Sequence, residues 1–199
     1  MAGVLKNVSY SSRQPQAMSA APIFIISGVP GSGKTTLSRT LMQRFSRGVH
    51  LPVDEFRELV VSGISHPIPK WTDETARQFA LARASATDVA RRYAQAGFAV
   101  AIDDVILHEQ AILDMLAALD GLAVHRIILR PPVEKALERN RTRKSKSFDP
   151  SILEDTIRML NGVYDQIDFA ASGWLVVDNG LQAVGETVSE VLRRTGATG

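Results

Sequence analysis

The chain has 199 residues, of which 45% are hydrophobic and 22% are charged, a composition typical of a globular protein of one domain. Its formal net charge of +2 is too small to indicate a nucleic-acid-binding surface, and the absence of cysteine excludes disulfides and thiolate-bound metals. No apolar run approaches the ~20 residues that a membrane span needs, and residues 1–20 lack the apolar segment of a secretory signal. We therefore expect a cytoplasmic protein without a membrane-spanning segment.

Residues 1–20 are rich in Ser, Gln and Ala and predict a disordered N-terminal extension, whereas residues 21–199 predict a single domain of alternating strands and helices. In chain order, the expected elements are a strand at 23–27, a helix at 37–44, a strand at 49–53, a helical turn or two at 55–61, a loop at 62–70, a helix at 72–96, a strand at 98–102, a helix at 109–119, a strand at 124–129, helices at 133–143 and 149–164, a strand at 174–177 and a helix at 183–194. This alternation predicts a three-layer α/β fold, in which helices cover both faces of a five-stranded parallel sheet.

The loop after the first strand matches the phosphate-binding pattern G-x-x-x-x-G-K-[ST] between a strand and a helix. Its glycines let successive backbone N–H groups point inward, and the following helix presents its positive end to phosphate. Lys34 supplies a positive charge for the β- and γ-phosphates, and the Thr35 hydroxyl can bind Mg²⁺. The residues expected to hold the nucleotide are Gly28, Val29, Pro30, Gly31, Ser32, Gly33, Lys34, Thr35 and Thr36.

Acidic residues follow the second and third strands, and ligands bind beyond the carboxyl ends of parallel strands. Pro52 cannot donate to a ladder, so the second strand should lie at a sheet edge. Asp54, which follows it, could accept the proton of an attacking hydroxyl, could orient Mg²⁺-bound water or could cap the helix at 55–61. Asp103 and Asp104 end the third strand and are candidate Mg²⁺ ligands. Because neighbouring strand residues point to opposite faces, we expect only one, preferably Asp103, to face the metal.

Arg139 and Arg143 lie four residues apart on a predicted helix and therefore share a face. With Lys144 and Lys146 they form a basic cluster that suits a lid over the triphosphate, although a solvated helix face explains it equally well. The four histidines, His50, His66, His108 and His125, show no ligand spacing and are interpreted as structural or surface residues.

The phosphate-binding loop, Asp54 before a helix, the strand ending in Asp103 and Asp104, and the helix carrying Arg139 and Arg143 resemble, in this order, the P-loop small-molecule kinases, especially the chloramphenicol phosphotransferase-like proteins. The resemblance covers about residues 22–180. It implies the P-loop NTPase fold with the kinase-type strand order 2-3-1-4-5, ATP and Mg²⁺ as cofactors, Asp54 as the base, and Arg139 and Arg143 in a lid at about residues 139–150. It also implies that Asp178 lies near the adenine and that residues 55–96, where no specific signature stands, bind the acceptor.

The sequence therefore predicts an ATP-dependent kinase that transfers the γ-phosphate to a hydroxyl of an unidentified small molecule. Two alternatives stay open, a nucleotide-binding regulatory module and a polynucleotide or nucleotide kinase. The chain has no Asn/Thr-Lys-x-Asp stretch of the kind that reads guanine, and its small charge and few aromatic residues make a nucleic acid an unfavoured partner. The sequence carries no signal of an oligomeric state.

Overall fold

The structure is a computed structural model that describes residues 20–68, 70–142 and 150–198. Its elements follow one another in the order β1 (Ile23–Gly28), α1 (Lys34–Met42), β2 (Gly48–Pro52), α2 (Val53–Glu58), α3 (Asp73–Gln95), β3 (Ala99–Asp104), α4 (Glu109–Ala118), β4 (Val124–Leu129), α5 (Val133–Arg141), the short 3-10 helix η1 (Pro150–Leu153), α6 (Glu154–Asp165), β5 (Leu175–Val177) and α7 (Val184–Thr195).

Within the described residues, the strands form one five-stranded parallel sheet with the order β2-β3-β1-β4-β5. The predicted fold class and strand order are confirmed. β2 pairs with β3 alone and so lies at an edge, where Pro52 costs no ladder hydrogen bond. β1 lies at the centre of the sheet, and all six of its residues are buried. The loop that follows β1 therefore leaves the sheet at its middle.

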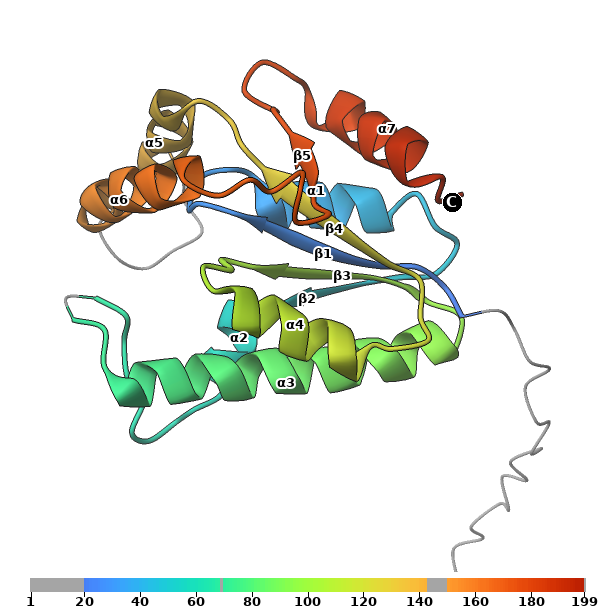
Figure 1. The fold of residues 1–199 in the computed structure, drawn as a ribbon, viewed down its shortest axis with the longest axis horizontal. Helices are drawn as coiled ribbons and strands as arrows, with labels where there is room; N and C mark the ends of the chain where they lie inside the picture. The colour runs from blue at the N-terminus through green and yellow to red at the C-terminus, as the bar shows by residue number, and fades with distance from the viewer. Residues whose placement is uncertain (1–19, 69, 143–149, 199) are drawn as a thin grey trace, which may run out of the picture.

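Helices cover both faces of the sheet (Figure 1), with α1 and α7 on one face and α3 and α4 on the other. Alternate residues of β1 supply the two cores: Ile23 and Ile25 pack toward α3 and α4, and Phe24 and Ile26 pack toward α1 and α7. Because both faces are buried, the strand is a continuous apolar run rather than an alternating one. Figure 1 shows α5 and α6 beyond the carboxyl ends of β1 and β3, where the phosphate-binding loop also lies.

Three element boundaries differ from the sequence prediction in ways that matter for the site. α1 begins at Lys34 rather than at residue 37, so the helix starts within the phosphate-binding motif. β3 runs to Asp104 rather than ending at residue 102, because it pairs with β1 and β2 on both sides as far as its two aspartates. α2 begins at Val53 and is capped by Pro52, so Asp54 lies in its first turn and is not the N-cap.

The long helix α3 agrees with its prediction. It spans Asp73–Gln95, and the Thr72 side chain at its N-cap accepts a hydrogen bond from the Thr75 backbone N–H. Asp73 and Glu74 lie in the first turn, where the helix dipole favours negative charge. A search of the described residues finds no helix of the length and hydropathy needed to cross a membrane.

Candidate active site

The loop after β1 adopts a conformation that requires glycine at two positions. Gly31 and Gly33 have φ angles of 81° and 98°, in the left-handed region. A Cβ atom on Gly31 would lie 2.1 Å from the backbone oxygen of Ala136 on α5, so a side chain there would displace the helix. Gly33 is the N-cap of α1, and the loop therefore ends at the positive end of that helix. The described geometry is that of an anion-binding loop.

Ser32 in this loop and Lys34 at the start of α1 carry polar side chains next to the expected phosphate position. The Lys34 ammonium donates to the backbone oxygens of Gly28 and Val29, at 2.9 and 3.2 Å, and so stays within the loop. The Ser32 hydroxyl is fully buried and has no hydrogen-bond partner among the described residues. A buried hydroxyl rarely lacks a partner, and a phosphate oxygen is a partner that this loop could receive.

A cavity of about 710 Å³ opens beside the loop and is large enough for a nucleotide. It lies between the start of α1, α5 and the turn that follows β5. Polar residues that line it include Lys34, Thr35, Thr36, Arg139, Asn179 and Gln182.

Arg139 and Asn179 attach the phosphate-binding loop to the turn after β5. The Asn179 amide nitrogen donates to the backbone oxygen of Ser32 at 2.9 Å, and the Arg139 guanidinium donates to the backbone oxygens of Asn179, at 2.8 Å, and Ser32, at 3.4 Å. Arg139 thus lines this cavity, and its role in a lid stays a prediction. Arg143, Lys144 and Lys146, the other members of the predicted basic cluster, lie outside the described residues.

Asp178, which the resemblance placed near the adenine, is not among the residues that line this cavity. Its carboxylate accepts a hydrogen bond from the Gly180 backbone N–H at 2.8 Å, and the residue is exposed. The structure brings its neighbour Asn179 to the cavity instead, because the turn after β5 points consecutive side chains in different directions.

Asp103 faces the phosphate-binding loop. It lies beside Ile26 of β1 in the sheet, and its carboxylate accepts a hydrogen bond from His50 of β2 at 2.7 Å. Burial alone would raise the pKa of Asp103, but the hydrogen bond from His50, the charge of Lys34 and the Thr35 hydroxyl outweigh it. The pKa of this carboxyl therefore lies below its ordinary value, and Asp103 is a carboxylate at neutral pH.

Asp104 points to the opposite face of the sheet, as the alternation of strand side chains predicts. One of its oxygens accepts from Arg83 Nε at 2.5 Å and the other from the Val105 backbone N–H at 2.8 Å. Burial raises the pKa of Asp104, Arg83 opposes this shift, and the charge of Asp54 adds to it. Both oxygens of Asp104 thus have partners within the protein, which leaves Asp103 as the better candidate for the metal.

Loss of one partner of the ion pair between Arg83 and Asp104 should be strongly destabilising, because both side chains are largely buried, at 15% and 2% exposed. Arg83→Met leaves a buried carboxylate without its cation and should lower the free energy of unfolding by about 3–5 kcal/mol. Adding Asp104→Asn removes the uncompensated charge and should restore more than half of the loss. Chemical denaturation of the three variants measures both effects.

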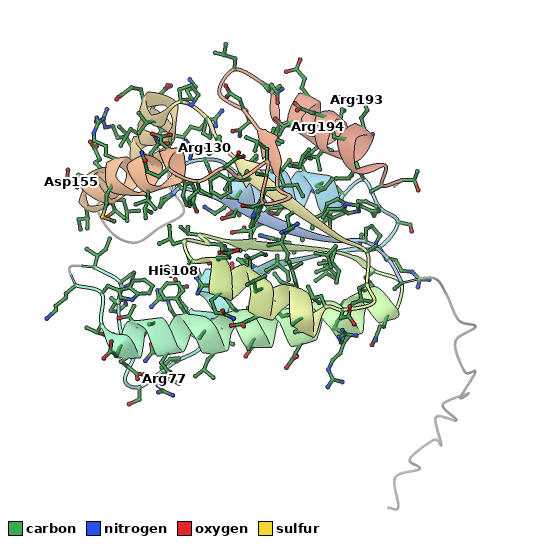
Figure 2. The ribbon with its side chains drawn as sticks, viewed as in Figure 1. Arg77, His108, Arg130, Asp155, Arg193 and Arg194 are labelled. Atoms are coloured by element: carbon green, nitrogen blue, oxygen red, sulfur yellow. The ribbon has the colours of Figure 1, made fainter. Side chains whose placement is uncertain are left out.

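Arg77 offers a matched control on the same helix. It pairs with Glu74, and its side chain is 66% exposed. Figure 2 shows Arg77 on the side of α3 that faces away from the sheet. Arg77→Met should leave the unfolding midpoint nearly unchanged. An equal loss in the two arginine variants would mean that the Arg83–Asp104 pair has no special role in stability.

Asp54 lies close enough to Asp104 for its charge to affect that carboxyl, which places it near the carboxyl ends of the strands, in the first turn of α2. Arg57, one turn later on α2, is 7% exposed and stacks on the Phe79 ring, with its guanidinium carbon 4.9 Å from the ring centroid. Its Nη1 donates to the Ser65 backbone oxygen, whereas its Nε is buried without a partner among the described residues. Trp71, 46% exposed, stacks on the same Phe79 ring, with the ring centroids 5.2 Å apart.

Sequence reasoning missed three residues of this site. Arg57 follows Asp54 by three positions and so shares its helix face, a spacing that points to it. His50 was interpreted as structural or surface, and the sequence did not indicate its contact with the candidate metal ligand Asp103. Asn179 carried no signal beyond its place after the last strand.

The residues on the loop side of the site fit a magnesium ion accompanied by phosphates. Thr35 and Asp103 supply a hydroxyl and a carboxylate oxygen, the hard donors that Mg²⁺ prefers. Within the described ranges, no three His, Asp or Glu side chains gather into a metal site of their own. Mg²⁺ commonly takes one or two protein ligands and completes its shell with substrate phosphates and water, so this small donor set suits it.

Comparisons with known proteins agree with this geometry. None of the curated proteins compared with the chain matches it. Among solved structures, the tunicamycin resistance protein of Deinococcus radiodurans is 19% identical, with 89% of this chain and 97% of that one covered and a TM-score of 0.60. Shikimate kinase from Acinetobacter baumannii is 18% identical, with coverages of 89% and 93% and a TM-score of 0.60. Thymidylate kinase from Candida albicans is 14% identical, with coverages of 90% and 92% and a TM-score of 0.60.

At these identities the likeness concerns the fold. The family assignment comes from the sequence, since the profile of the family described as "AAA domain" matches residues 23–165. Because the matched segment is more than half of the chain, the protein belongs to the AAA domain family, and its fold is that of the P-loop small-molecule kinases.

Proposed function

We propose that this protein is an ATP-dependent phosphotransferase that moves the γ-phosphate to a hydroxyl group of a small molecule. One observation carries the proposal: Asp54 follows β2 at the end of the sheet where the phosphate-binding loop also follows β1, and it lies in the first turn of a helix that does not line the nucleotide cavity. A nucleotide-binding module needs the loop alone. A carboxylate at this end of the sheet, outside the nucleotide cavity, is what a kinase needs to accept the proton of its acceptor.

Each residue then has a distinct task. Lys34 balances the charge of the β- and γ-phosphates, and Asp54 orients the acceptor hydroxyl and takes its proton as the oxygen attacks phosphorus. Thr35 and Asp103 would hold Mg²⁺, which supplies positive charge for the transferred phosphoryl group. Arg139, at the wall of the cavity, places a guanidinium where it can bind the nucleotide.

Residues around Asp54 suggest the chemical character of the acceptor. Arg57 is a buried guanidinium for which no ion pair exists among the described residues, and its Nε has no hydrogen-bond partner there. Such a group is costly unless a ligand satisfies it. Phe79 and Trp71 add an aromatic surface beside it. An acceptor that carries an anionic group and an apolar or ring portion, in addition to its hydroxyl, would suit this side of the site.

Arg57→Met should therefore raise the KM for an anionic acceptor by about 10–100-fold, because a charge-assisted hydrogen bond is worth about 1.5–3 kcal/mol. The kcat should change less, since Arg57 would bind the ground state and the transition state alike. Arg47→Met is the matched control, because Arg47 also stacks on a phenylalanine, Phe98, at 5.7 Å. Equal KM values for the two variants would remove Arg57 from the acceptor site.

Acceptor screening tests the function itself. The full chain is incubated with γ-labelled ATP, Mg²⁺ and a panel of hydroxyl compounds arranged as neutral, cationic and anionic sets. The expected result is transfer of label to one set, strongest for the anionic one, and none with Lys34→Ala. Nucleotide binding without transfer to any member of the panel would favour a binding module instead.

A nucleotide acceptor is the second candidate, because Arg57 could also bind a phosphate. Nucleoside monophosphates therefore belong in the panel. A phosphate acceptor needs no base, so a nucleotide kinase should keep most of its activity in Asp54→Asn, whereas a hydroxyl kinase should lose it. The response of this variant separates the two reactions.

A further inference from the structure

His50 lies in β2, at the edge of the sheet, and its side chain is 10% exposed. Its Nε2 is 2.7 Å from Oδ2 of Asp103, whose side chain is 9% exposed. Leu51, the next residue, belongs to the core on the α3 side, so His50 points to the α1 side, as Asp103 does. A short hydrogen bond between two largely buried side chains is a fixed feature of this part of the sheet.

The register explains how the two side chains meet. Pro52 of β2 is the residue paired with Asp103, and His50 is paired with Ala101, two positions earlier on β3. Residues two apart on a strand share a face, so His50 and Asp103 lie on the same face of the sheet, and the imidazole reaches along the strand direction to the carboxylate. A shorter side chain at position 50 would leave a gap between β2 and the carboxylate.

We infer that His50 is a positioning residue that holds the Asp103 carboxylate toward Thr35 and Lys34, and so prepares the magnesium site of the proposed phosphotransferase. The inference rests on the proposed function for the identity of the metal. A carboxylate has two oxygens and about four lone-pair positions. His50 occupies one position on Oδ2, which fixes the rotation of the group and leaves the remaining positions for the Thr35 hydroxyl and for a metal-bound water.

Partners that hold a metal-binding carboxylate typically matter for metal affinity, and their loss costs about 10–100-fold. A purely structural role of His50 predicts a different effect on nucleotide binding. If the hydrogen bond only joined β2 to β3, its loss would lower stability and weaken nucleotide binding to the same degree with and without the metal. The two roles therefore differ in how ADP affinity depends on Mg²⁺.

Calorimetric titration of the full chain with ADP, once in Mg²⁺ and once in EDTA, measures this dependence without any acceptor. His50→Leu should weaken ADP binding in Mg²⁺ by about 10–100-fold and leave binding in EDTA within about twofold. His50→Gln should keep most of the affinity, because its amide nitrogen can donate from nearly the same place, whereas the shorter His50→Asn should resemble His50→Leu. In an Asp103→Asn background, His50→Leu should have no further effect.

His125 is the control imidazole. It lies in β4, faces the same side of the sheet and stacks on Phe24 at 5.2 Å. His125→Leu should leave both affinities unchanged. The inference is overturned if His50→Leu binds Mg·ADP as the natural protein does, or if it loses the same factor in Mg²⁺ and in EDTA. Should His50→Leu fail to fold, the comparison of His50→Gln with His50→Asn decides in the same way.

A failure of the His50 inference can be distinguished from a failure of the proposed function. A natural protein that binds ADP no better in Mg²⁺ than in EDTA contradicts the magnesium-dependent kinase as well as the inference. A natural protein that transfers phosphate while its His50 variants keep full affinity for Mg·ADP contradicts the inference alone.

Discussion

Lys34→Ala should abolish most phosphate transfer, with kcat reduced by at least about 10²–10³-fold, the effect of removing one preorganised charge or donor from a transition state. The Lys34 ammonium already lies inside the phosphate-binding loop, where it donates to the backbone oxygens of Gly28 and Val29. It can therefore move to an incoming phosphate with little rearrangement. Affinity for ADP should fall less than kcat, because charge develops on the γ-phosphoryl group during transfer.

The control for this variant is another lysine. Lys135 on α5 pairs with the exposed Glu138 and is not among the residues that line the nucleotide cavity. Lys135→Ala should keep the kcat of the natural protein within about twofold. Retention of transfer in Lys34→Ala, measured with γ-labelled ATP under saturating acceptor, would contradict the assignment of this loop to the γ-phosphate.

The parts of the fold that depend on neighbouring residues could be predicted from the sequence. The buried strand β1, the glycine loop and the Thr72 cap of α3 each rest on a short local pattern. Pro52 correctly indicated an edge strand, since a residue without an N–H avoids the middle of a ladder. The lateral order of the strands was beyond such patterns, because an apolar run looks the same at any place in the sheet. The correct strand order came from the resemblance to the P-loop small-molecule kinases.

The candidate site was harder to predict because its side chains meet through the sheet register. The contact of His50 with Asp103 depends on which residue of β2 stands beside which residue of β3. The difference between Asp103 and Asp104 likewise depends on which face each helix covers. Asp178 and Asn179 show the same limit, since the conformation of one turn decides which of them reaches the cavity. Arg57 is the exception, because helical spacing alone relates it to Asp54.

Asp54→Asn should lower kcat for a hydroxyl acceptor by about 10²–10⁴-fold, the usual contribution of a general base. The substitution keeps the size of the side chain and removes its capacity to take a proton. The affinity for Mg·ADP should stay within a few-fold of the natural value, because Asp54 lies outside the residues that line the nucleotide cavity. The KM for the acceptor should change less than kcat, because the Asn side chain can still hydrogen-bond the hydroxyl but cannot take its proton. The expected signature is thus a loss in kcat with binding retained, measured by steady-state transfer and by calorimetry.

Glu55→Gln is the matched control for this variant. Both residues are exposed and lie in the first turn of α2, where a negative charge interacts favourably with the helix dipole. Each substitution should therefore cause a similar small loss of stability, seen as similar shifts in thermal melting. If Asp54→Asn reduces kcat no more than Glu55→Gln does, its effect is that of the helix dipole, and the proton must go to another group. A selective loss in Asp54→Asn, with nearly unchanged binding of both substrates, would locate the proton transfer at the start of α2.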